Sequence, residues 1–149
     1  MRARRAVTAS FLLATALAFA GTNAEREDVA AARKPIETYL RGHATGDGQI
    51  MRTAFLPTAH IEGVREGAFT SWTVEEYVAR FPGRPADNES QRKRRIDMIE
   101  VSGTAATARV TLENPGLTAT DFFVLLKVDG EWKIANKVYH VELLPAPAK

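Results

Sequence analysis

The chain has 149 residues, no cysteine and a formal net charge of +2 at neutral pH. This length fits one domain around a single hydrophobic core. Without cysteine there can be no disulfide and no thiolate metal site, so packing alone must hold the fold together.

The first 24 residues have the pattern of a secretory leader. Met1–Arg5 is basic, residues 7–20 are apolar, and residues 18–20 or 22–24 offer a cleavage site. An uncleaved anchor is the alternative, although the apolar run is short for a membrane span. Removing the leader takes away three arginines and no acidic residue, so the formal charge falls from +2 to −1. We therefore expect an exported protein, periplasmic or secreted, that binds no nucleic acid and leaves the membrane after cleavage.

Two helices are predicted at the start of the domain. Residues 28–43 place apolar or small side chains every three or four positions, which is typical of a helix with one buried stripe. Pro35 lies inside this helix. It is expected either to kink the helix or to stand at the start of the part with the stronger helical pattern. Asp47 follows a break and is a good N-cap for a short helix over 48–55.

The remaining elements are mostly strands. A capping box at Thr73–Glu76 predicts one further helix, which ends before Pro82. Strands are predicted over 57–64, 68–72, 91–102, 105–113, 120–128 and 131–141. This order of elements predicts an α+β domain over 25–142, in which N-terminal helices pack on a curved, mainly antiparallel sheet and leave a cone with a cavity inside. A disordered tail is expected over 143–149.

The predicted site depends on the stretch Thr120–Val141. Asp129-Gly130 is a strong signal for a two-residue hairpin turn, and such a turn pairs positions whose numbers add up to about 259. One face of the hairpin then carries a partly polar set suited to a pocket lining: Asp121, Phe123, Asn136 and His140.

Asp121 and His140 are the most specific candidates for catalytic residues. In this register they are diagonal neighbours, close enough for a carboxylate–imidazole hydrogen bond that could work as an acid and a base. The alternative is a satisfied buried pair, or an aspartate at the sheet edge with an exposed histidine. The candidate ligand contacts are Tyr39, His43, Trp72, Arg95, Phe123 and Asn136.

Each ligand contact also has a purely structural explanation. Tyr39 and His43 lie four residues apart on the first helix and can be core members, and Trp72 can be aromatic core. Arg95 can turn inward to hold an anion, or a bulge can turn it to the surface. The three histidines, His43, His60 and His140, lack metal-ligand spacing, so no metal and no cofactor are expected.

The other face of the hairpin is apolar and has no helix left to cover it. It carries Phe122, Val124 and Leu126 with Tyr139 and the stems of Lys133 and Lys137. A homodimer through this outer sheet face would bury it.

Four stretches resemble the nuclear-transport-factor-2-like (NTF2-like) superfamily. They are LRGHATGDG (40–48), AFLPTA (54–59), RKRRI (92–96) and TDFFVLLKVDGEWKIANKVYH (120–140). Within it, residues 27–142 resemble the group called “Putative lumazine-binding”, which is related to polyketide-cyclase and ketosteroid-isomerase domains. The resemblance implies a cone-shaped NTF2-like (cystatin-like) fold that commonly dimerises through its sheet. It implies no single function, because the superfamily includes isomerases, cyclases, dehydratases, binding proteins and dimerisation modules.

Three functions therefore stay open. The first is an exported, dimeric domain that binds a small organic molecule in a partly polar cavity without a complete catalytic set. The second is an acid/base enzyme of the cyclase or isomerase type that uses Asp121 and His140. The third is a non-catalytic dimerisation or interaction module. The carboxylate base, tyrosine and protonated acid of ketosteroid isomerases cannot be placed on matching positions.

Overall fold

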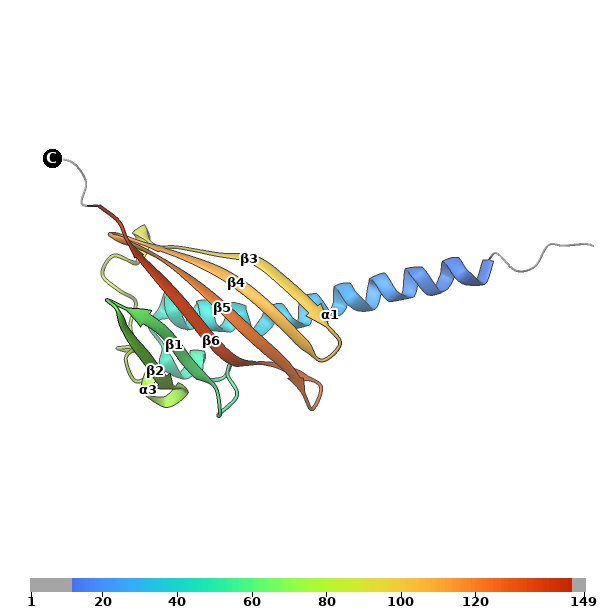
Figure 1. Ribbon diagram of the computed structural model, residues 1–149, viewed down its shortest axis with the longest axis horizontal. Helices are drawn as coiled ribbons and strands as arrows, with labels where there is room; N and C mark the ends of the chain where they lie inside the picture. The colour runs from blue at the N-terminus through green and yellow to red at the C-terminus, as the bar shows by residue number, and fades with distance from the viewer. Residues whose placement is uncertain (1–11, 146–149) are drawn as a thin grey trace, which may run out of the picture.

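The computed structural model describes residues 12–145 (Figure 1). The basic start of the predicted leader and residues 146–149 of the predicted tail lie outside the described residues. The elements are α1 (Leu12–Thr45), α2 (Gly48–Arg52), β1 (His60–Arg65), β2 (Ala68–Thr73), α3 (Val74–Val78), the 3₁₀ turn η1 (Glu89–Gln91), β3 (Lys93–Ser102), β4 (Ala105–Asn114), β5 (Leu117–Val128) and β6 (Glu131–Leu143).

The strands form one six-stranded sheet in the order β2-β1-β6-β5-β4-β3. Neighbouring strands are antiparallel except β1 and β6, which are parallel. The helices lie on one side of this curved sheet, and α1 crosses its inner face (Figure 1). The predicted α+β architecture is confirmed.

The local signals at helix and strand ends act as the sequence indicates. The carboxylate of Asp47 accepts hydrogen bonds from the backbone N–H groups of Gln49 and Ile50, at 2.8 and 3.2 Å, and so caps α2. Thr73 and Glu76 form the predicted capping box at the start of α3. The hairpin turn places Asp129 at φ 51° and Gly130 at φ 83°, the left-handed values that a two-residue turn of this type requires.

Helix α1 is longer than predicted. It runs from Leu12 through Pro35 to Thr45, so it begins inside the predicted leader. Its buried stripe includes Ala32, Ile36 and Tyr39, which pack into the core cluster. Among residues 12–145, no helix is both long enough and apolar enough to cross a membrane.

The register of the β5–β6 hairpin changes part-way along. From the turn to the pair Leu125–Ile134 the strands pair as predicted, but Val124 then pairs with Asn136, so Ala135 is an extra residue. This β-bulge reverses the facing of every later residue in β6. Lys137 and Tyr139 consequently face the helices, where the sequence predicted Asn136, Val138 and His140.

A second irregularity corrects the predicted facing of β3. The register shifts between Ile96 and Met98, and the residues facing the core are Arg94, Ile96, Ile99 and Val101. Arg95 was predicted to turn inward, but its side chain is 64% exposed and bonds to Asp97 at 2.6 Å. The bulge that the sequence left open as an alternative is therefore present.

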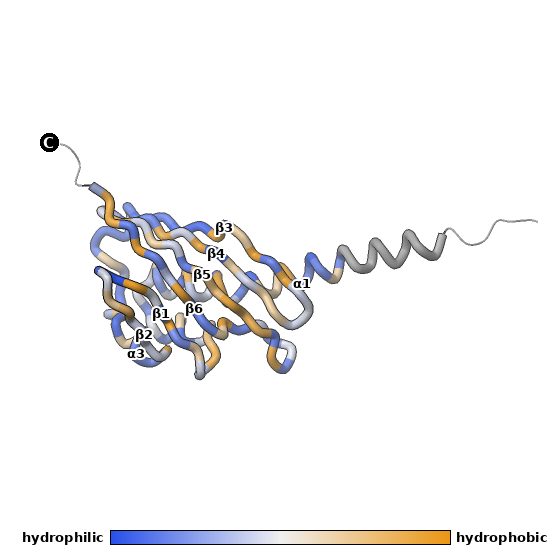
Figure 2. Tube along the Cα trace, viewed as in Figure 1, coloured by the Kyte–Doolittle hydropathy of each residue, from blue (hydrophilic) through white to orange (hydrophobic). Residues whose placement is uncertain are grey.

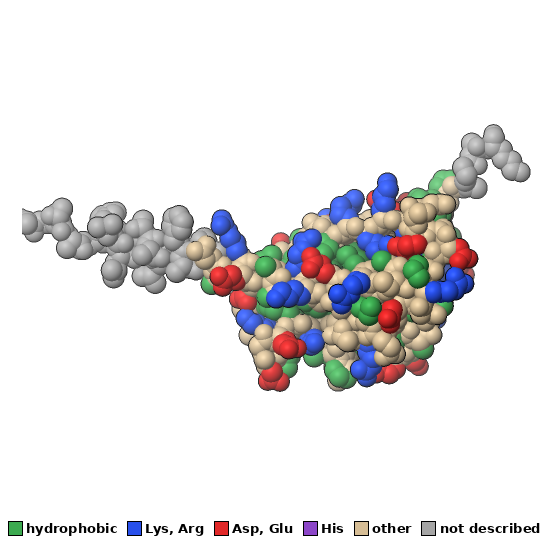
Figure 3. Space-filling model, turned by 180° about the vertical axis from the view of Figure 1, so that it is seen from behind, with side chains coloured by type: hydrophobic (Ala, Val, Ile, Leu, Met, Phe, Trp, Pro, Cys, Tyr) green, Lys and Arg blue, Asp and Glu red, His purple; other side chains and the backbone are tan. Residues whose placement is uncertain are grey.

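The outer face of the sheet keeps an exposed apolar stripe. Hydrophobic and hydrophilic positions alternate along the central strands (Figure 2). The outer apolar stripe consists of Phe122, Val124, Leu126 and Val128 of β5, Val138 of β6 and Met98 of β3, all between 36% and 48% exposed. Charged side chains of both signs are spread over the opposite side of the molecule (Figure 3). Tyr139 and Lys137 do not belong to the stripe, because the bulge turns both inward.

Candidate functional site

Five polar side chains meet inside the cone. Tyr39 and His43 come from α1, Tyr77 from α3, Asp121 from β5 and Lys137 from β6. The spacing of four residues puts Tyr39 and His43 on one face of α1, and the bulge at Ala135 brings Lys137 to the same side as Asp121. We call these five side chains the polar cluster.

Lys137 is the hub of the polar cluster. Its ammonium group donates to Asp121 Oδ2 at 2.9 Å, to the Tyr39 hydroxyl at 2.7 Å and to the Tyr77 hydroxyl at 3.4 Å. Three donors therefore have three acceptors, which uses the full capacity of a lysine side chain.

The Tyr39 hydroxyl links the ion pair to the histidine. It donates to Asp121 Oδ2 at 2.6 Å and lies 2.9 Å from His43 Nε2. His43 Nε2 is also 3.1 Å from the Tyr77 hydroxyl, and the two phenol oxygens are 3.3 Å apart. A continuous chain of hydrogen bonds thus runs from Asp121 through Tyr39 to the imidazole, and the bonds of such a chain strengthen one another.

The ion pair in this cluster is deeply buried. Asp121 is 1% exposed and Lys137 is 4% exposed. Burying two charges costs several kcal/mol per ion, which their mutual attraction and added hydrogen bonds must offset. A pair of apolar side chains of similar volume would often be at least as stable, so stability alone is a weak reason for this arrangement.

The cluster also fixes protonation states. Burial raises the pKa of Tyr39 well above its ordinary value, and the Asp121 carboxylate adds to this effect, so the phenol keeps its proton. Burial, with the positive charges of Lys137 and Arg94, holds the pKa of His43 well below its ordinary value. Burial alone would lower the pKa of Lys137, but the Asp121 carboxylate outweighs it and leaves that pKa raised. At neutral pH the cluster therefore holds an ammonium group, a protonated phenol and a neutral imidazole.

Aromatic side chains surround the cluster. The ring of Phe123 packs edge-on to Tyr39 with centroids 5.0 Å apart, and Phe81 packs edge-on to His43 at 5.0 Å. The ring of Trp72 stacks on Tyr139 at 5.9 Å and lies 6.3 Å from Tyr77. The Lys137 ammonium also lies 5.4 Å from the centre of the Tyr139 ring, within the range of a cation–π contact.

The structure brings together some of the predicted site residues and separates others. Tyr39, His43, Asp121 and Phe123 lie inside the cone, and Trp72 lies in the aromatic layer beside Tyr77. The predicted contact between Asp121 and His140 is wrong, because His140 lies beyond the bulge, pairs with Thr120 and is exposed on the outer face.

Asn136 and Arg95 are also turned away from the cone. The Asn136 side chain accepts from the backbone N–H of His60 at 2.9 Å and donates to Glu62 at 3.1 Å, so it fastens β6 to β1. Arg95 forms its ion pair with Asp97 on the outer face. Neither residue reaches the polar cluster.

Two cluster members, Tyr77 and Lys137, were not predicted. Tyr77 stands in the short helix after the capping box, and only its helical spacing from Val74 and Val78 indicates a buried position. Lys137 follows an apolar–polar alternation that places it outside, and nothing in the sequence marks the bulge that reverses it.

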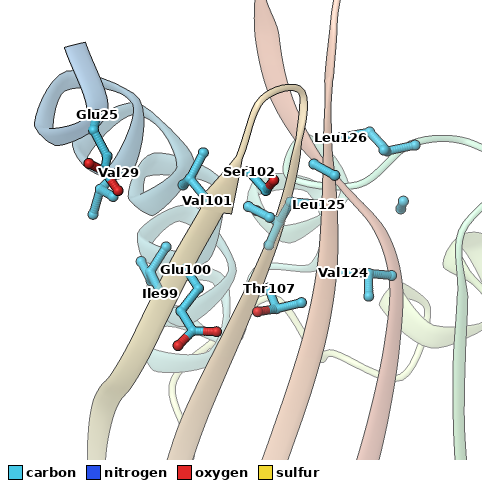
Figure 4. Close-up of a pocket in the computed structure, with 13 residues that line it drawn as sticks. Glu25, Val29, Ile99, Glu100, Val101, Ser102, Thr107, Val124, Leu125 and Leu126 are labelled. Carbon is cyan, nitrogen blue, oxygen red and sulfur yellow. The ribbon is translucent and has the colours of Figure 1, made fainter. Parts of the chain in front are cut away.

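An open cavity of about 760 Å³ lies elsewhere, where α1 passes the β3–β4 hairpin (Figure 4). Val29 of α1 stands beside Ile99 and Val101, whereas Val124 and Leu126 lie on the far side of that hairpin. The lining draws on both faces of the sheet and includes no member of the polar cluster. The candidate site is therefore the polar cluster, which this cavity does not reach.

Within residues 12–145, no three His, Asp or Glu side chains come together in a way that could hold a metal ion.

Comparison with known proteins places the chain in a family. Residues 27–140 match the model of the family described as “Putative lumazine-binding”. The chain belongs to this family. An NTF2-like protein of unknown function from Shewanella baltica is 31% identical, with a TM-score of 0.71, over 80% of this chain and 96% of its own. An NTF2-like protein of unknown function from Methylobacillus flagellatus is 31% identical, with a TM-score of 0.69, over 78% and 93% of the two chains.

Two less similar proteins have names that refer to enzymes. The aldolase FrzH of a Cladobotryum species is 27% identical over 104 residues, which is 68% of this chain and 82% of that protein. A ketosteroid isomerase-like protein from Erwinia carotovora shares the fold, with a TM-score of 0.57 at 16% identity over 76% and 95% of the two chains. The predicted NTF2-like fold is confirmed by these similarities.

The protonation state of His43 predicts a pH dependence of stability. The unfolded chain protonates this histidine below about pH 6.5, whereas the folded chain resists protonation, so stability falls as the pH decreases below that value. Between pH 7.5 and pH 5.5, we expect wild type to lose about 1 kcal/mol more unfolding free energy than His43→Gln.

Urea unfolding at the two pH values measures this difference. His140→Gln is the matched control, because it removes an exposed histidine and should keep the wild-type dependence. An identical pH dependence in wild type and His43→Gln would show that His43 is not held neutral.

Proposed function

We propose that this protein is an exported homodimer that binds a small organic molecule at the polar cluster. The observation that carries the proposal is the buried Lys137–Asp121 pair with two phenols and an imidazole around it. Groups of this kind are costly to bury and gather at functional sites more often than chance explains. The family description, “Putative lumazine-binding”, supports a small-molecule ligand.

The chemistry of the cluster favours a ligand with oxygen atoms that accept hydrogen bonds. Lys137 stays charged and can donate to a ligand oxygen that replaces one of its three present acceptors. The aromatic side chains of Trp72, Tyr77 and Tyr139 line the same part of the cone and suit a planar molecule. Lumazine, a planar heterocycle with two carbonyl groups, is therefore a suitable first probe.

Thermal denaturation with lumazine tests the binding proposal. A ligand at about one hundred times its dissociation constant adds about 2.7 kcal/mol to the unfolding free energy, which corresponds to a melting temperature several degrees higher. We expect this rise in wild type and its loss in Asp121→Asn/Lys137→Met, which removes both charges together so that neither is buried alone.

Lys127→Met is the matched control for the binding test. Lys127 and Asp28 form a half-buried ion pair at 2.7 Å away from the cluster, so the variant should keep the full response. No response of wild type to lumazine or to a panel of aromatic carbonyl compounds would favour the interaction module instead.

An acid/base enzyme is the second candidate, and the similarity to an aldolase favours it. The residues that support it differ from the predicted pair of Asp121 and His140. His43 offers a neutral imidazole that can take a proton from the carbon next to a carbonyl group. The C–H electrons would form the new carbon–carbon double bond, and Lys137 would stabilise the negative charge that develops on the carbonyl oxygen.

Hydrogen–deuterium exchange tests the enzyme candidate. We expect the protein to accelerate exchange of the hydrogens next to the carbonyl of cyclohexanone in D₂O by about 10²-fold or more, as followed by proton NMR. His43→Gln should abolish the acceleration, and His140→Gln should retain it. If His140→Gln lost the activity and His43→Gln kept it, the result would support catalysis by Asp121 and His140, as the sequence suggested, and contradict the role of His43.

The outer apolar stripe supports the homodimer. Its side chains are exposed on the outer face of β5, β6 and β3, and a hollow of about 240 Å³ lies between Met98, Phe122 and Val138. Continuous exposed apolar surface is typical of a protein interface, and a twofold dimer would place the stripe of one chain against that of its partner. The leader-like start of the sequence supports export.

Sedimentation tests the dimer. Leu126→Glu places a charge in the middle of the stripe of both partners, so we expect monomers or insoluble protein where wild type sediments as a dimer. Gln49→Glu is the control, because Gln49 is exposed on α2, on the helix side of the sheet and away from the stripe. If Leu126→Glu sedimented like wild type, the proposed interface would be wrong.

A further inference from the structure

The Tyr77 hydroxyl is the most weakly held member of the polar cluster. Its three contacts, to His43, Tyr39 and Lys137, measure 3.1, 3.3 and 3.4 Å. The four contacts among the other members measure between 2.6 and 2.9 Å. Because hydrogen bonds weaken with distance, Tyr77 contributes the least to the network that it completes.

Tyr77 is more exposed than the three most deeply buried members of the polar cluster. Tyr39, Asp121 and Lys137 are at most 4% exposed, whereas Tyr77 is 9% exposed. Its aromatic neighbours Trp72 and Phe81 are half-buried, as is His43. A molecule that approaches the ammonium group of Lys137 from this side would pass these half-buried side chains and then meet Tyr77.

The element that carries Tyr77 is short. Helix α3 has five residues and leads into a segment without regular structure before η1. Few helical hydrogen bonds fix its position, so it moves at lower cost than α1 or the central strands.

We propose that the Tyr77 hydroxyl holds the place of a ligand oxygen. The ligand displaces the Tyr77 side chain, and its own oxygen then accepts a hydrogen bond from Lys137 beside Tyr39 and His43. This inference rests on the proposed function, because it assumes that the polar cluster is the binding site. It adds the position of the ligand and the chemical class that fits it.

That class is a neutral molecule with a carbonyl or phenolic oxygen. The charges of Lys137 and Asp121 already neutralise each other at 2.9 Å. A carboxylate ligand would bring a second negative charge into this buried site without a second cation to balance it. A neutral oxygen needs only the hydrogen bond that Lys137 now gives to Tyr77.

Removing the Tyr77 side chain makes the proposal testable without the natural ligand. Tyr77→Ala should leave a cavity the size of a phenol ring with the Lys137 ammonium at its end. We expect phenol to bind this variant about tenfold or more tighter than toluene, because only phenol restores the lost oxygen. Cyclohexanone should bind, and benzoate should not. Calorimetry or the rise in melting temperature measures the affinities.

Two controls separate the oxygen position from a general cavity. Phe81→Ala removes a neighbouring ring whose centroid lies 5.5 Å from that of Tyr77, and it should bind toluene at least as tightly as phenol. Adding Asp121→Asn/Lys137→Met to Tyr77→Ala should abolish the preference for phenol. Equal binding of phenol and toluene by Tyr77→Ala, or a preference for phenol that survives without Lys137, would overturn the proposal.

A variant that does not fold alone still gives a result. If Tyr77→Ala folds only with additive, refolding from urea with phenol, toluene or no additive makes the same comparison, and recovery with phenol alone supports the proposal. Tyr77→Leu, which keeps more packing, is the second variant, and its failure to distinguish the two compounds would count against the inference. If wild type ignores lumazine while Tyr77→Ala prefers phenol, the proposed ligand fails but the oxygen position stands. If wild type binds lumazine but Tyr77→Ala shows no preference for phenol, the proposed binding function is supported and the proposed position of the ligand oxygen is wrong.

Discussion

One extra residue in β6 decides what lies inside this protein. Because the side chains of a strand alternate between the two faces of a sheet, the single insertion at Ala135 exchanges the faces for everything that follows it. Lys137 enters the cone as the diagonal neighbour of Asp121, and His140 turns to the outer face. The polar cluster, the aromatic layer and the composition of the outer face all follow from that exchange.

The exchange of faces matters because it buries the charge of Lys137 beside that of Asp121. A lysine brought into a core is tolerated only where a carboxylate and further acceptors meet it, and here Asp121, Tyr39 and Tyr77 together supply them. Burial, together with the charges of Asp121 and Lys137, raises the pKa of the Tyr39 phenol and lowers the pKa of His43, so both groups are neutral at pH 7. Position, charge and protonation are therefore properties of the group as a whole, and no member can be changed without affecting the others.

Much of the fold could be predicted because its signals are local. The cap at Asp47, the capping box at Thr73 and the turn at Asp129-Gly130 each depend on a few adjacent residues, and all three form as expected. The site depends instead on register over a distance. The sequence gives Ala135 no glycine, proline or other mark of a bulge, and a lysine at position 137 agrees with the outward alternation that the bulge overrides. Tyr39 and His43 were placed correctly because helical spacing, unlike strand facing, is unaffected by one insertion in the sheet.

The parallel ladder between β1 and β6 joins two unequal parts of the molecule. It consists of three residue pairs, and they involve Lys137, Val138 and Tyr139, the segment just beyond the bulge. The small part on one side of this ladder consists of β1, β2 and α3 and carries Tyr77. The large part on the other side is the antiparallel meander β3–β6, which carries Asp121. A short ladder separates at lower cost than the long ones beside it. The polar cluster spans this ladder, because Tyr77 of the small part contacts His43, Tyr39 and Lys137. The hydrogen bonds of the cluster therefore add a second connection between the two parts of the sheet.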